Sequence, residues 1–167
     1  FYAIHNHYDR VAEALSTSGL KRENLSGVAE VVLVPIADVH RGSVLALEYA
    51  KRLSHDVRAL TILTTPEERE RFIRRWKRFP HITDSVELVA LEYDYRDILT
   101  PLVDYIKHVN QEEFPNQLTT VVIPEFVPGS AAANILHNQT ARRLRSLLRQ
   151  YKDIVIIEVP FQIDSQL

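Results

Sequence analysis

The sequence predicts an α/β protein built on a five-stranded parallel sheet with helices on both faces. Five short runs are rich in β-branched residues and bounded by turn signals, which is typical of strands buried on both faces. Four segments between these runs repeat apolar residues at helical spacing. Strands that alternate with helices favour a parallel sheet, because each crossover helix packs back onto one face of it.

The same two patterns place the elements along the chain. The expected strands span residues 31–36, 57–63, 86–91, 119–123 and 154–159. The expected helices span residues 43–54, 66–79, 97–110 and 134–151. Pro66 and Pro101 fall in the first turns of the second and third helices, where proline is tolerated. Phe72, Trp76 and Phe79 are spaced by four and three residues, so the second helix is expected to reach Phe79.

The first 27 residues form a region of their own. Tyr8, Val11 and Leu15 recur at helical spacing and predict a short helix over residues 7–15, followed by a polar connector that ends at Gly27. We therefore expect a helix with its connector over residues 1–27 and one α/β domain over residues 28–167. Because the sequence opens on Phe1 rather than Met, we expect a processed chain or an excised fragment.

Composition excludes several classes of protein. The 167 residues are 46% hydrophobic and 25% charged, which is the balance of an ordinary globular domain. The absence of cysteine excludes thiolate nucleophiles, cysteine-based zinc sites and iron–sulfur clusters. The net charge of -2 gives no reason to expect a nucleic-acid partner. The longest apolar run, residues 31–37, is far shorter than the roughly 20 residues of a membrane span.

Candidate ligand-binding residues lie in the loops after the first and fourth strands. In an open α/β sheet, ligands bind outside the carboxyl ends of the strands, where the strand order reverses. The candidates after the first strand precede a helix whose free N–H groups favour an anion. They are Asp38, His40 and Arg41. The candidates after the fourth strand are Gly129, Ser130, His137, Asn138 and Gln139.

Structural interpretations of the same residues remain open. Asp38 or Ser43 can simply cap the following helix, as such residues commonly do. Residues 137–139 can form a hydrogen-bonded cluster between helices instead of a binding site. Two basic stripes, one in the second helix and one formed by Arg142, Arg145, Arg149 and Lys152, are most simply interpreted as solvated helix faces.

Motifs of the common enzyme classes are missing. The four glycines, Gly19, Gly27, Gly42 and Gly129, cannot make a G-x-G-x-x-G fingerprint or a P-loop. No G-x-S-x-G elbow occurs, and the histidines lack metal-ligand spacing. We therefore expect neither an enzyme nor a metal site.

Five segments together resemble a known family. They are His7–Ala12, Val34–Arg41, Tyr95–Leu102, Val122–Phe126 and Leu136–Ala141. They look like the cytosolic C-terminal domain of permeases of the APC superfamily, the amino-acid permease homologues that include bacterial potassium importers. That domain resembles the universal stress proteins, whose strand order is 3-2-1-4-5. The ATP-binding members of that group carry signature glycines, whereas the corresponding positions here include Pro124, Val127 and His137.

The resemblance implies a regulatory and dimerisation domain on the cytoplasmic face of the membrane. A transmembrane transporter bundle would precede it in the same polypeptide, and residues 7–15 would be the juxtamembrane link. Cyclic di-AMP or an adenine nucleotide would be the regulatory ligand, with no other cofactor. In the implied strand order residues 154–159 form an edge strand, through which we expect a homodimer. The alternatives are a purely structural dimerisation module without a ligand and a stand-alone ATP-binding universal stress protein.

Overall fold

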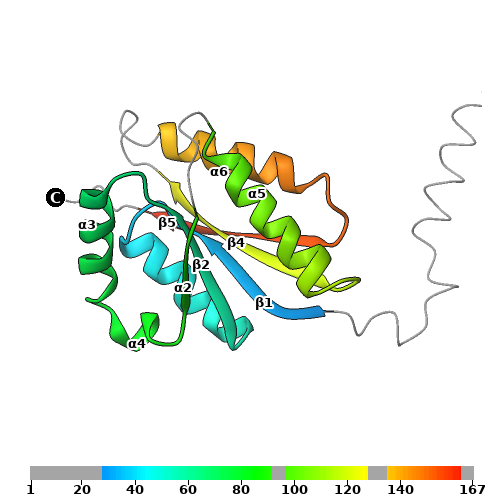
Figure 1. The fold of residues 1–167 in the computed structure, drawn as a ribbon, viewed down its shortest axis with the longest axis horizontal. Coiled ribbons are helices and arrows are strands. Elements are labelled where there is room, and N and C mark those ends of the chain that lie inside the picture. Colours follow the sequence, from blue (N-terminus) through cyan, green and yellow to red (C-terminus); the bar gives the residue numbers. More distant parts are fainter. Residues whose placement is uncertain (1–27, 92–96, 128–134, 163–167) are drawn as a thin grey trace, which may run out of the picture.

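The structure, a computed structural model, describes residues 28–91, 97–127 and 135–162. The helix expected over residues 7–15 and its connector therefore lie outside the described residues. Five strands form one parallel sheet in the order β3-β2-β1-β4-β5, which confirms the expected topology (Figure 1). They are β1 (Val28–Pro35), β2 (Asp56–Ile62), β3 (Glu87–Leu91), β4 (Leu118–Val127) and β5 (Ile154–Gln162).

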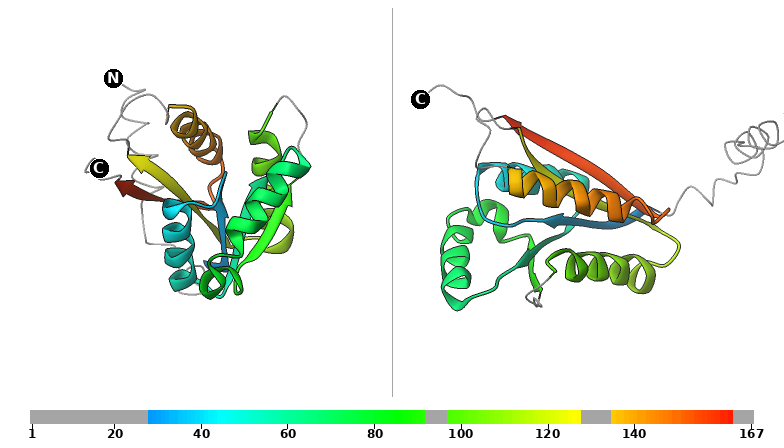
Figure 2. Two further views of the ribbon diagram at one scale, coloured as in Figure 1. Left: turned by 90° about the vertical axis from the view of Figure 1, so that its left-hand side faces the viewer. Right: turned by 90° about the horizontal axis from the view of Figure 1, so that it is seen from above.

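Helices cover both faces of the sheet. One face carries α2 (Arg41–Leu53), α3 (Pro66–Trp76) and α4 (Pro80–Thr83), and the other carries α5 (Leu99–His108), the π-helix η2 (Val109–Glu113) and α6 (Ile135–Leu148) (Figure 2). Each face has its own hydrophobic core, and the central strands contribute alternate side chains to the two: Val32 and Val34 to one, Val31 and Leu33 to the other. Burial on both faces explains why residues 31–36 are apolar at every position.

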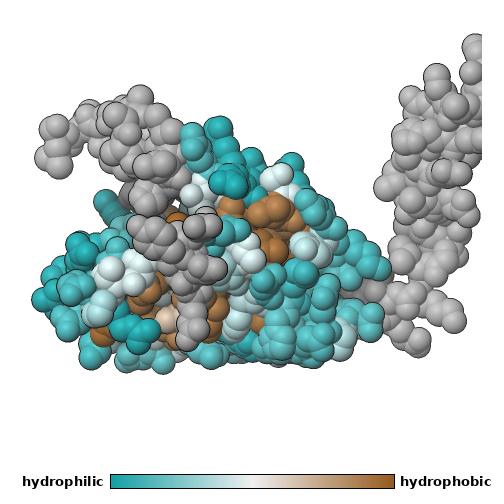
Figure 3. All heavy atoms as spheres, turned by 45° about the horizontal axis from the view of Figure 1, so that its top comes forward, coloured by the Kyte–Doolittle hydropathy of each residue, from teal (hydrophilic) through white to brown (hydrophobic). Residues whose placement is uncertain are grey.

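The outer surface of the described residues is mainly polar, while the apolar residues gather in the two cores (Figure 3). Most described atoms on the face shown in Figure 3 are hydrophilic, with smaller hydrophobic areas among them. Within the described ranges, no helix has the length and apolar character needed to cross a membrane.

Strands β4 and β5 run further than their neighbour β1. Strand β4 pairs with β5 from Thr119 to Val127, but its register with β1 ends at Val121. The last residues of β4 and β5 therefore form a two-stranded ribbon beyond the end of β1. Pro124 lies in this ribbon, where its missing N–H breaks no bond to β1.

The second helix is shorter than the sequence pattern predicts. It ends at Trp76, and Phe79 instead precedes the short helix α4, with φ −123° and ψ 56°. The reason is Pro80, because a residue before proline is driven out of the helical region. Phe72 and Trp76 are both buried and stack with ring centroids 5.9 Å apart, while Phe79 packs against the same core after the turn.

The third helix continues as a π-helix that the sequence analysis did not predict. Its wider turn buries both Val109 and Asn110, which follow each other in the chain. The Asn110 side-chain amide donates to the carbonyl oxygens of Gln117 and Asp153 and to the Thr119 hydroxyl, at 3.0–3.2 Å. Asn110 thereby ties the start of β4 to the turn before β5.

Candidate functional site

The loop after β1 is organised by the cap of helix α2. His40 is the N-cap residue, and its Nδ1 accepts hydrogen bonds from the backbone N–H groups of Gly42 and Ser43, each at 3.1 Å. The Ser43 hydroxyl accepts in return from the His40 N–H at 2.9 Å, which completes a capping box. The N-cap is therefore His40 rather than Asp38 or Ser43, although Ser43 contributes to the cap through the capping box. Two of the N–H groups expected to attract an anion are already bonded to His40.

Asp38 fastens this loop to the neighbouring helix α3. Its carboxylate accepts from the Val39 N–H at 2.8 Å and forms an ion pair with Arg75. Both side chains of the pair are about half exposed. Arg41 is exposed in the first turn of α2. The structure thus places Asp38, His40 and Arg41 in one short loop at the start of α2.

The second half of the predicted site is less fully described. Gly129 and Ser130 lie outside the described residues, and for His137 and Asn138 only their place in α6 is described. The Gln139 side chain is exposed in the first turns of the same helix. The prediction that the loops after β1 and β4 form one ligand site therefore stays a prediction.

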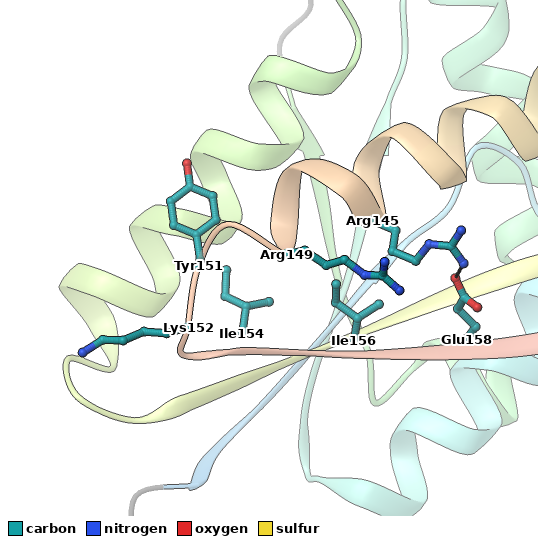
Figure 4. A pocket seen from close by; sticks show the side chains of 7 residues that line it. All are labelled: Arg145, Arg149, Tyr151, Lys152, Ile154, Ile156 and Glu158. Carbon is teal, nitrogen blue, oxygen red and sulfur yellow. Dashed lines mark hydrogen bonds and ion pairs between the residues drawn. The ribbon is translucent and has the colours of Figure 1, made fainter. Parts of the chain in front are cut away.

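A groove that the sequence analysis did not identify lies between the end of α6 and strand β5 (Figure 4). Its volume is about 460 Å³, and we call it the basic groove. Its lining residues are Arg145, Arg149, Tyr151, Lys152, Ile154, Ile156 and Glu158. Arg145 forms an ion pair with Glu158 across the groove. Arg142, Arg149 and Lys152 of the basic stripe are exposed, as expected of a solvated helix face, whereas Arg145 is paired.

The signal for this groove was present in the sequence but could not be interpreted without the sheet. Residues 135–152 contain five cations and no acidic residue, whereas α3 carries three glutamates beside its four arginines. Which strand this stripe faces depends on how α6 packs. The structure sets it beside the edge strand β5.

An apolar stripe lies on the other side of β5. Leu45, Tyr49 and Leu53 follow each other at intervals of four along α2 and are 39–45% exposed. The opposite flank of α2 faces α4, because the Lys51 ammonium donates to the carbonyl oxygen of His81. The stripe is therefore turned towards β5, which α2 also contacts and on which Val155 is 38% exposed. We call these four residues the α2–β5 apolar patch.

A charged cluster around Arg58 joins strand β2 to α5 and η2. The Arg58 side chain is 13% exposed and binds Asp56 at 3.1 Å and Glu113 at 2.8 Å, with the Tyr105 hydroxyl at 3.3 Å. Burial disfavours the charge of Arg58, but its bonds to Asp56, Tyr105 and Glu113 outweigh burial and raise its pKa above the usual value. Because β2, α5 and η2 each contribute a partner, the cluster is structural. Among the described residues, no group of His, Asp or Glu side chains could hold a metal ion.

Comparison with known proteins places this architecture in a family. Residues 28–161 match the family model of the KimA potassium transporter C-terminal domain. The chain is 33% identical over 162 residues to the potassium transporter KimA of Bacillus subtilis, covering 96% of this chain and 26% of that protein. The chain thus spans about a quarter of the length of this relative.

Among solved structures, a universal stress protein from Archaeoglobus fulgidus is similar with a TM-score of 0.49 and 13% sequence identity, over 78% of this chain and 93% of that one. The resemblance stated from the sequence is confirmed by the family match, which covers the described α/β region except its last residue. The chain belongs to the family of KimA potassium transporter C-terminal domains.

Proposed function

We propose that this chain is a cytosolic regulatory and dimerisation domain of a potassium transporter and has no enzymatic activity of its own. The family match over residues 28–161 carries the proposal. A transmembrane part of the same polypeptide would conduct the ion, and the α/β domain would lie on the cytoplasmic side and control it. The relative, of which this chain covers about a quarter, is a potassium transporter.

The open edge of β5 supports the dimerisation part of the proposal. Strand β5 has nine residues and no partner on its outer side within the described chain, whereas the other edge strand, β3, has five. A long apolar edge is normally covered or paired, because its free N–H and C=O groups would otherwise bind other chains. Antiparallel pairing of two β5 strands about a two-fold axis satisfies these groups. The same rotation brings two copies of the α2–β5 apolar patch together.

The regulatory ligand in this proposal is cyclic di-AMP, bound at the loops after β1 and β4. An isologous dimer offers each residue twice, which suits a ligand with two equivalent phosphates and two bases. Arg41, exposed beside the N-terminus of α2, would contact phosphate, and Asn138 and Gln139 would pair with an adenine edge. ATP is expected to bind weakly, because Pro124 offers no N–H to a phosphate.

Two measurements test this function. Light scattering of the chain at micromolar concentration should give twice the 19.3 kDa of one copy, and a particle of single mass would contradict dimerisation. Calorimetry should show cyclic di-AMP binding that Arg41→Ala weakens about tenfold or more, the scale of a hydrogen bond to a charged group. The matched control is Arg78→Ala, an exposed arginine just after α3. If the unmodified chain dimerises but binds no dinucleotide, the structural dimerisation module is the surviving alternative.

A further inference from the structure

The basic groove combines positive charge with an apolar floor. Figure 4 shows Ile154 and Ile156 rising from β5, with the Arg149 guanidinium lying over Ile156. The Arg145–Glu158 ion pair closes one end, and Tyr151 stands at the other. Its volume of about 460 Å³ falls within the range of small-ligand sites, roughly 300–1,000 Å³.

Arg149 is exposed and lines the basic groove beside Arg145. Arg58, Arg75 and Arg145 each pair with at least one carboxylate. The Arg149 side chain makes no hydrogen bond or ion pair within the described part of the chain, although Glu158 lines the same groove. Glu158 is engaged by Arg145. The groove therefore holds one solvent-exposed guanidinium with no protein partner among the described residues, and a second guanidinium that pairs with Glu158.

The general preference of helix C-termini for cations does not account for this arrangement. Cations near the last turn are favoured by the helix dipole, and this explains Arg145. Arg149 lies beyond Leu148, the last residue of α6, and is directed over the isoleucines of β5. The helix dipole accounts for positive charge near the end of α6. It does not account for a groove that is also lined by Ile154, Ile156 and Tyr151.

We propose that the basic groove binds a phosphate ester. The Arg149 guanidinium would form the two parallel hydrogen bonds that phosphate oxygens accept. Ile154, Ile156 and the Tyr151 ring would contact the carbon skeleton that the phosphate carries. Glu158 acts as an internal competitor, because it occupies the Arg145 guanidinium that would otherwise be a second donor. This site is separate from the proposed dinucleotide site at Arg41 and does not rest on it.

Two sources of phosphate ester fit this chemistry, a free nucleotide and the headgroup of an anionic phospholipid. The experiment therefore has two arms. Adenosine monophosphate is titrated into the 167-residue chain by calorimetry, and vesicles of phosphatidylglycerol with phosphatidylcholine are sedimented with it. Vesicles of phosphatidylcholine alone are the reference. Binding of the nucleotide only assigns a soluble ligand, and binding to the anionic vesicles only assigns a lipid headgroup.

Paired substitutions make the test specific for the groove. Arg149→Ala should weaken binding about tenfold, and Glu158→Gln should strengthen it several-fold by releasing Arg145. The matched controls change the same charges on α3 or just after it: Arg78→Ala and Glu70→Gln should each alter binding less than twofold. Unfolding midpoints of all variants show that each remains folded. Arg41→Ala should leave this binding unchanged.

Three results would overturn the assignment. The first is that neither probe binds the unmodified chain. The second is that the control substitutions alter binding as much as those in the groove, which would mean a diffuse charge effect. The third is that binding is lost in Arg41→Ala and retained in Arg149→Ala, which would place the phosphate in the loop after β1 instead.

Discussion

At the scale of single residues, His40 determines how helix α2 begins. Its Nδ1 accepts from two backbone N–H groups, so this nitrogen carries no proton in the capped state. His40→Ala should lower the free energy of unfolding by about 1 kcal/mol, the usual cost of a lost cap. His40→Ser should retain most of the stability, because serine is a preferred cap. Urea unfolding of the three proteins measures both effects.

The same pair of variants separates capping from ligand binding by His40. If the imidazole only caps, the serine variant should bind cyclic di-AMP as the unmodified chain does. A serine variant that is stable yet binds the dinucleotide more weakly would give His40 a direct contact with the ligand. A serine variant as unstable as the alanine variant would contradict the capping role.

Asp97 makes stability depend on pH in the acid range. The Thr100 hydroxyl and then the Leu99 N–H bind its carboxylate and hold its pKa below the usual value of about 4. Because the pKa is lower in the folded state, the stabilisation is complete above the unfolded pKa and is lost as pH falls through the folded pKa. At pH 7 the unmodified chain should therefore have a higher free energy of unfolding than the Asp97→Asn variant. The difference should shrink as pH falls through the folded pKa of Asp97.

This pH dependence is checked by unfolding both proteins across that range. The asparagine keeps an acceptor for the N–H groups at the start of α5 and removes only the charge. A difference between the two proteins that stays constant from pH 7 to pH 2 would contradict the assignment to the carboxylate.

At the scale of elements, the π-helix η2 depends on one buried side chain. Asn110→Ala removes the donor that satisfies two carbonyl oxygens and a hydroxyl, so we expect a loss of about 1–3 kcal/mol in the free energy of unfolding. Gln111→Ala is the matched control, because the neighbouring Gln111 is exposed. Chemical denaturation of both variants measures the difference. Equal, small losses would show that η2 does not need this amide.

The sequence predicts the elements well where burial alone decides them. The five strands are rich in apolar residues at successive positions because both faces of the sheet are covered by a core, and this pattern needs no knowledge of neighbours. The second helix was predicted too long because the apolar spacing continues through Phe79, whereas Pro80 ends the helix before it. The π-helix could not be predicted, since the Asn110 amide is held in part by the carbonyl oxygen of Asp153, which is distant in the chain.

The candidate sites depend even more on contacts between residues that are distant in the chain. The sequence indicates that Asp38, His40 and Arg41 share a loop at the start of a helix, because all three are neighbours in the chain. It does not indicate that Asp38 pairs with Arg75 of α3. It also cannot align the cations of α6 with the isoleucines of β5. Such contacts depend on the packing of helices against an edge, which local patterns do not encode.

At the scale of the whole molecule, β5 separates two surfaces of different chemistry. The α6 side of this edge carries the basic groove, and the α2 side carries the α2–β5 apolar patch. A two-fold axis through paired β5 strands would bury the apolar patch of both copies on one side. On the other side it would set two basic grooves next to each other. Dimerisation and phosphate binding can therefore use the same edge without competing for the same side chains.

This arrangement predicts which exposed apolar residue matters for assembly. Leu53 of the α2–β5 apolar patch and Ile98 before α5 are almost equally exposed, at 45% and 46%. Leu53→Lys should weaken the dimer tenfold or more, because the two-fold axis would bring two new ammonium groups close together and would desolvate them. Ile98→Lys adds the same charge on the opposite side of the sheet and should leave the dimer unchanged. Sedimentation equilibrium of both variants gives their dissociation constants, and the β5 interface is wrong if the two are equal or if Ile98→Lys is the one that dissociates the dimer.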